Sequence, residues 1–133
     1  MTRCLKTKAF ARFARREGLP DSALCQTVLD MNRGLVDADL GGGVVKQRLS
    51  RSGQGTSSGY RVIVVFRRHG RAVIVFGYAK RSRSTVDPRE LAGFKLLAKH
   101  VLAMNARDVD RAVETGAFEE VRCDAQASEA LWE

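Results

Sequence analysis

The sequence predicts an α+β fold, in which an N-terminal helical hairpin packs on a small antiparallel sheet and further helices follow. Apolar residues recur at three- and four-residue spacing near both ends of the chain. Two β-branched runs, 60–66 and 72–78, lie between them. With 133 residues, the chain is long enough for one domain. We therefore expect a single domain over 1–133, with the helical hairpin at 2–33, the sheet at 35–83, and helices and a strand at 87–123.

Positive charge is concentrated in the middle of the chain. The net charge is +8, from 23 Lys and Arg and 15 Asp and Glu. Residues 41–86 contain ten of the basic side chains and no acidic one, whereas residues 87–133 are acidic overall. This asymmetry indicates one anion-binding surface rather than a general solubility charge, and nucleic acid is the first candidate ligand.

The three cysteines, Cys4, Cys25 and Cys123, are an odd number without motif spacing. We expect neither a disulfide framework nor a zinc site from them, and a reducing cytoplasm suits them best. No apolar run approaches the roughly 20 residues of a membrane-spanning helix. The sequence therefore predicts no membrane association, no metal and no cofactor.

The first 34 residues predict two antiparallel helices. A helix over 2–17 is expected from apolar side chains at helical spacing, which are Leu5, Ala9, Phe10 and Phe13. Gly18 is in the position that ends such a helix. Pro20 then begins a second helix, which stops before Gly34.

The central strands are expected at 44–50, 60–67 and 71–79. A glycine triplet at 41–43 precedes them and indicates a hinge or a close backbone approach. Alternation puts Lys46 and Arg48 on the same face of the first strand. A short turn at 68–70 joins the other two strands in an antiparallel hairpin, so Arg61 should lie beside the basic residues that follow residue 79.

The C-terminal third predicts two helices and a last strand. Asp87, Pro88 and Glu90 have the spacing of an N-cap, first and third helical residue. Asn105 should cap a second helix over 106–115, and residues 118–123 could return as a strand. The acidic tail that follows is expected to fray.

Three segments of the chain resemble the conserved blocks of the RelE/ParE superfamily of bacterial toxins. They read KQR at 46–48, GYRVI at 59–63 and KRSRS at 80–84. The segments DADLGGG and FEEVRCD are similar to the RelE-like branch related to HigB. The resemblance covers residues 35–123. It implies a RelE-like fold, with two N-terminal helices on a small antiparallel sheet.

The resemblance also implies an activity and partners. It implies the toxin of a type II toxin–antitoxin system, a metal-independent endoribonuclease that cuts mRNA on the ribosome. In that reaction the ribose 2′-hydroxyl attacks the adjacent phosphate, which needs a base, an acid and positive charge. The implied partners are mRNA, the ribosome and a cognate antitoxin, which we expect to be a small helix-turn-helix protein.

Five basic side chains are the candidate catalytic residues: Lys46, Arg48, Arg61, Lys80 and Arg81. Lys46 is the candidate base, because neighbouring arginines disfavour its ammonium form. Arg48 and Arg61 would clamp the phosphate, and Lys80 or Arg81 would stabilise the leaving oxygen. Further contacts with RNA are expected from Arg51, Tyr60, Arg67, Arg68 and Arg83.

Two alternatives stay open at this point. A ParE-like protein has a similar fold and inhibits DNA gyrase without the RNA-cutting residues. A basic globule could also bind nucleic acid without catalysis, because charge runs are usually solvated faces. Lys46 and the basic cluster at 80–83 favour cleavage over both.

Overall fold

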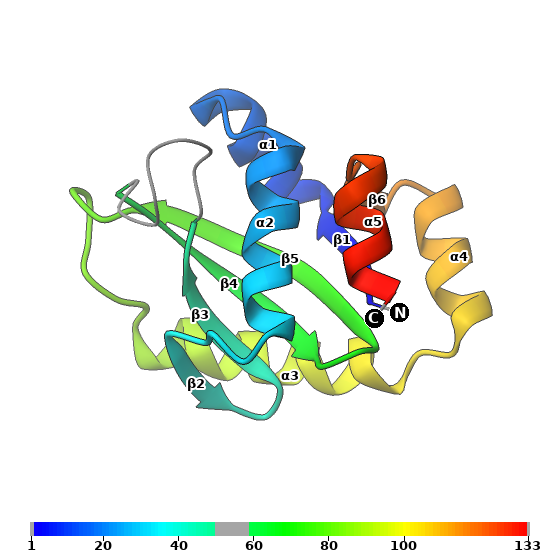
Figure 1. Cartoon of the computed structure of the whole chain (residues 1–133). Coiled ribbons are helices and arrows are strands. Elements are labelled where there is room, and N and C mark those ends of the chain that lie inside the picture. Colours follow the sequence, from blue (N-terminus) through cyan, green and yellow to red (C-terminus); the bar gives the residue numbers. More distant parts are fainter. Residues whose placement is uncertain (1, 50–58, 133) are drawn as a thin grey trace.

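The computed structural model describes residues 2–49 and 59–132, which form a mixed sheet with helices on both faces (Figure 1). Six strands of the described chain lie in the following order across the sheet: β2 (Ala38–Gly41), β3 (Val44–Arg48), β4 (Tyr60–Arg67), β5 (Arg71–Ala79), β1 (Arg3–Thr7) and β6 (Phe118–Glu120). Most neighbouring pairs are antiparallel, and β1 and β5 are parallel. The predicted α+β class is confirmed.

Each face of the sheet has its own apolar core. One core contains side chains of α1 (Lys8–Glu17), α2 (Asp21–Asn32) and α5 (Ala125–Trp132). The other contains side chains of α3 (Pro88–Ala103) and α4 (Ala106–Glu114). Because both faces are covered, the central strands are apolar in near-continuous runs rather than in alternation.

The expected helix over 2–17 is wrong in its first part, where β1 lies in place of a helical turn. Cys4 and Leu5 are both buried, but in different cores, as neighbouring residues of a central strand are. The side chain of Thr7 then caps α1 by accepting a hydrogen bond from the backbone N–H of Phe10 (3.2 Å). The spacing of the apolar residues could not distinguish a strand from a helical turn over residues 3–7, because the strand is short and its partner strands lie far away in sequence.

The glycine triplet forms the turn between β2 and β3. Gly41, Gly42 and Gly43 all have positive φ, which other residues rarely adopt. A side chain at Gly43 would also meet Leu102 of α3. The predicted close approach of the backbone is therefore confirmed, and residues 38–41 belong to the sheet, within the expected range of 35–83.

The predicted β4–β5 hairpin is confirmed with the expected bounds. Its register places Arg61 opposite Tyr78 and Arg67 opposite Arg71. The predicted starts of α3 and α4 are confirmed as well, since Asp87 and Asn105 each form a capping box with the third helical residue. β6 is shorter than the expected strand over 118–123.

The tail beyond residue 123 is helical, contrary to the expected fraying. It forms α5, which lies beside α2 (Figure 1). Leu131 is buried in the core under α2, and its carbonyl accepts a hydrogen bond from the N–H of Thr2. Burial of a few apolar residues offsets the ordering cost of a tail that has weak helical signals of its own.

A disulfide joins Cys25 of α2 to Cys123, contrary to the expectation of no disulfide. The two cysteines are 98 positions apart, so no local spacing indicated the pair. The remaining cysteine, Cys4, is buried, and burial raises the pKa of its thiol to about 12. The cysteines therefore no longer support a reducing compartment, because disulfides persist in oxidising ones.

None of the helices in the described part of the chain combines the length and the apolar character that crossing a membrane requires.

Candidate functional site

Lys46, Arg48 and Arg61 line one cavity of about 290 Å³ at the end of the sheet where β4 begins. Lys46 and Arg48 project from the same face of β3, as alternation predicts. Arg61 is the cross-strand partner of Arg48. The structure thus brings together three of the five predicted catalytic side chains. We call this cavity the cationic pocket.

Among the described residues, the lining of the cationic pocket contains one carboxylate, that of Asp37. The Asp37 carboxylate accepts a hydrogen bond from the backbone N–H of Arg48 and lies 3.9 Å from its guanidinium. Buried Gln47 fixes residues 35–37 against β3, because its side-chain amide donates a hydrogen bond to Leu35 O (2.7 Å) and accepts one from the N–H of Asp37 (3.0 Å). Sequence reasoning missed Asp37 and Gln47, because their roles depend on the contact between β3 and residues 35–37.

The other two predicted catalytic residues lie outside the lining of the cationic pocket. Lys80 and Arg81 are exposed residues directly after β5. Arg81, Ser82 and Arg83 line a second cavity, whereas Ser84 lines the cationic pocket. The segment 81–84 therefore separates two neighbouring cavities.

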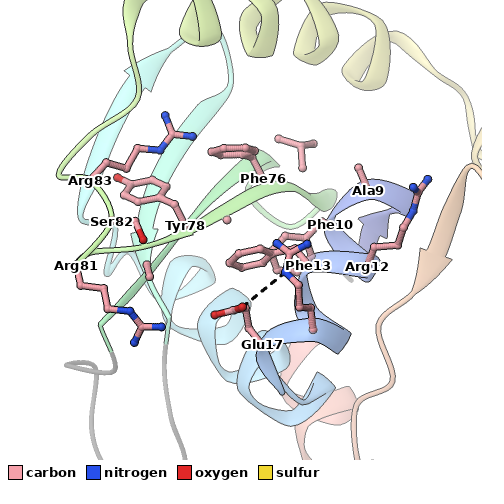
Figure 2. Close-up of a pocket in the computed structure, with 14 residues that line it drawn as sticks. Ala9, Phe10, Arg12, Phe13, Glu17, Phe76, Tyr78, Arg81, Ser82 and Arg83 are labelled. Carbon is pink, nitrogen blue, oxygen red and sulfur yellow. Dashed lines mark ion pairs between the residues drawn. The ribbon is translucent and has the colours of Figure 1, made fainter.

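The second cavity, of about 610 Å³, lies between α1 and the last part of β5 (Figure 2). We call it the aromatic groove. Its aromatic lining comes from both elements and consists of Phe10, Phe13, Phe76 and Tyr78. The Arg83 guanidinium lies over Phe76 and Tyr78, 4.9 and 5.3 Å from the ring centroids, and pairs with Glu90 (2.6 Å).

Tyr78 lies at the junction of the two cavities. Its ring lines the aromatic groove, and it is paired across the strands with Arg61 of the cationic pocket. Its hydroxyl is buried and has no hydrogen-bond partner among the described residues. Burial raises the pKa of Tyr78, while the nearby charges of Arg61 and Arg83 act in the opposite direction.

The residues expected to contact RNA are spread over the molecule. Tyr60 donates a hydrogen bond to Glu17 (2.9 Å) and packs edge-on against Phe13. Arg67, the last residue of β4, and Arg68, the first residue of the turn at the other end of the hairpin, donate to Leu102 O and Asn32 O. Arg83 lines the aromatic groove, and Arg51 lies outside the described residues. RNA contact by these residues stays a prediction.

The described residues contain no group of three His, Cys, Asp or Glu side chains placed to hold a metal ion. His69 lies in the hairpin turn, and His100 is exposed in the last turn of α3. The described side chains of the cationic pocket supply one amine and two guanidinium groups, which are anion ligands.

Fold and site together define a small α+β protein with a cationic, anion-sized pocket at one end of its sheet. The chain belongs to a known family, because residues 2–121 match the model described as the RelE toxin of the RelE/RelB toxin–antitoxin system. No curated protein matches the chain. The predicted RelE-type toxin is confirmed, and its family implies a cognate antitoxin as partner.

Proposed function

We propose that this toxin is a metal-independent endoribonuclease that cleaves mRNA on the ribosome, within the RelE-like branch related to HigB. The observation that carries the proposal is the convergence of Lys46, Arg48 and Arg61 on one pocket. Ribosome-dependent RNA cleavage is also the general activity of the family to which the chain belongs.

The reaction needs no group beyond RNA and these side chains. In the proposed reaction Lys46 acts as the base that takes the proton of the ribose 2′-hydroxyl, and the 2′-oxygen bonds to the adjacent phosphorus. The bond from phosphorus to the 5′-oxygen breaks, leaving a cyclic phosphate and, after protonation, a 5′-hydroxyl. Arg48 and Arg61 stabilise the negative charge that develops on the phosphate oxygens.

In this proposal the leaving 5′-oxygen is stabilised by Lys80 or Arg81. Both side chains are exposed directly after β5, and Ser84 of the same segment lines the cationic pocket. Either residue can donate a proton to the leaving oxygen, which balances the proton that Lys46 has removed.

The proposal locates the protein in the cytoplasm, because its substrate is ribosome-bound mRNA, and in that compartment Cys25 and Cys123 would be kept reduced. A small helix-turn-helix antitoxin is the proposed partner. Such a partner needs acidic and apolar residues to cover the basic surface, and a segment that folds as it docks could supply them.

The proposal is tested with purified protein, ribosomes and a defined mRNA. Lys46→Ala and Arg61→Ala should each lower the cleavage rate by about 10²–10⁴-fold. Lys99→Ala is the matched control, since Lys99 is an exposed lysine of α3 outside both cavities, and it should cleave at the wild-type rate.

Wild-type rates in Lys46→Ala and Arg61→Ala would refute the proposed site. Omitting the ribosome separates ribosome-dependent cleavage from cleavage of free RNA. Inhibition of DNA gyrase supercoiling by a protein that leaves mRNA intact would instead support the ParE-like alternative.

A further inference from the structure

We propose that the aromatic groove binds a nucleotide of single-stranded RNA next to the one that is cut in the cationic pocket. This proposal rests on the proposed function for the identity of the cut nucleotide. It assigns a ligand to the larger of the two cavities described above.

The groove exists because β5 extends beyond β1. The two strands pair only from Arg71 to Ile74, and the chain then turns from Thr7 into α1. Residues 75–79 of β5 and one side of α1 form the walls (Figure 2). A side chain at Gly77 would come within 2.7–2.8 Å of ring carbons of Phe10 and Phe13, so these rings lie directly on the strand.

The groove offers flat surfaces on which a base can stack. Phe13 and Phe76 are only partly buried. The Arg16 guanidinium lies 5.5 Å from the ring centroid of Phe13, and that of Arg83 lies over Phe76. Aromatic rings and guanidinium planes are the side chains on which proteins stack unpaired bases.

The charge of the lining is complementary to phosphate. Among the described residues, four arginines line the groove, Arg12, Arg16, Arg81 and Arg83, against a single carboxylate, Glu17, and Arg83 is paired with Glu90 outside the lining. Glu17 is already engaged, because it accepts a hydrogen bond from Tyr60 and lies 3.7 Å from Arg16. A ligand with flat rings and repeated negative charge fits this lining, and single-stranded RNA has both.

The groove and the cationic pocket lie on either side of one short segment. Arg81, Ser82 and Arg83 line the groove, and Ser84 lines the pocket. Tyr78, whose hydroxyl has no partner among the described residues, lies between the two and opposite Arg61. An RNA strand that passes along residues 81–84 would therefore reach both cavities.

An acidic peptide is the competing ligand. Residues 75–79 are not paired with β1, and such a strand edge can accept a peptide strand. The aromatic rings of the lining and the nearness of the cationic pocket favour RNA, because neither feature is needed for strand addition.

The test measures binding of the full chain to a short 2′-O-methyl RNA, whose blocked 2′-hydroxyl prevents cleavage. Fluorescence anisotropy over a range of salt concentrations gives the dissociation constant and its salt slope. Arg12→Ala and Arg16→Ala should each weaken binding and lower the salt slope by about 0.7, the value for one phosphate contact with a single strand.

Arg15→Ala is the matched control on the same helix. Arg15 is exposed, lies outside the groove lining and faces Glu119 at 3.8 Å, so its removal should leave the slope unchanged. Equal slopes for all three variants and the wild type would overturn the proposal. So would an acidic peptide that binds through Arg12 and Arg16 while RNA binding stays unchanged in their absence.

A base analogue separates stacking from charge. A 2-aminopurine in the RNA should lose fluorescence on binding, and at equal occupancy this quenching should be reduced in Phe13→Leu but kept in Arg12→Ala. Binding without quenching overturns the stacking role. Because the RNA cannot be cut, these results do not depend on catalysis, and a loss of cleavage in Lys46→Ala leaves them unchanged.

Discussion

Arg48 and Arg61 lie directly opposite each other on β3 and β4. Like charges in this position are destabilising by about 0.2–1 kcal/mol. Asp37 lies near Arg48 and partly compensates its charge. A pair of opposed arginines that costs stability is expected where the binding of a polyanion, and not the fold, requires the positive charge.

Arg61→Gln should therefore leave the free energy of unfolding unchanged or raise it by up to about 1 kcal/mol. The same variant should lose cleavage activity, because one ligand of the phosphate is gone. Urea denaturation and the ribosome assay on one preparation measure both. A variant that is clearly less stable than the wild type would show that Arg61 supports the fold instead.

Arg67 and Arg71 are opposed in the same way on β4 and β5, but they have structural partners. Arg67 donates to Leu102 O and Arg71 to Val101 O, both at 2.7 Å, near the C-terminus of α3. Positive charge at this helix end is favourable. Arg67→Gln and Arg71→Gln should each lower the free energy of unfolding by about 0.5–1.5 kcal/mol.

The Arg67→Gln variant also tests the expectation that Arg67 contacts RNA. Unchanged RNA binding in Arg67→Gln would assign this arginine to the fold alone. A smaller salt slope of binding would support the RNA contact.

The disulfide between Cys25 and Cys123 should stabilise the protein by about 2–4 kcal/mol, because it closes a long loop in the unfolded chain. Denaturant unfolding of the oxidised protein with and without reductant measures the difference. Cys123→Ser should unfold at the same denaturant concentration under both conditions. If the denaturant midpoint of the wild type were the same with and without reductant, the prediction would be contradicted.

Two glycines form a matched pair for packing. Gly77→Ala would place a methyl group 2.7–2.8 Å from ring carbons of Phe13 and Phe10, and should cost about 1–3 kcal/mol. Gly93 lies in α3 with open space around the position of a Cβ, so Gly93→Ala should stabilise by about 0.5–1 kcal/mol. The denaturation midpoint should therefore fall in Gly77→Ala and rise in Gly93→Ala.

The carboxylate of Glu90 should make stability depend on acidity. Its hydrogen bond from Arg83, and then that from the N–H of Asp87, hold the pKa of Glu90 below its ordinary value of 4.5. The stabilisation is therefore complete above about pH 4.5 and is lost as pH falls through the folded-state pKa. The stability difference between wild type and Glu90→Gln should shrink over that range. A difference that stays constant with pH would contradict this.

Much of the fold could be predicted, because the signals are local. The capping boxes at Asp87 and Asn105 involve residues three positions apart, and the β4–β5 hairpin is closed by a short turn. Strand alternation and antiparallel pairing led us to expect that Lys46, Arg48, Arg61, Lys80 and Arg81 converge. The structure places the first three in one pocket, whereas Lys80 and Arg81 lie outside its lining.

The sequence by itself thus determined the α+β class, the strands that carry the basic residues and the resemblance to the toxin family. Only the tertiary structure decided that residues 3–7 are a strand and that Cys25 forms a disulfide with Cys123. It also decided that Arg81 lines the aromatic groove and not the cationic pocket. The physical reason is the same in each case. Contacts between residues far apart along the chain satisfy these groups, and such contacts leave no periodicity or spacing in the sequence around them.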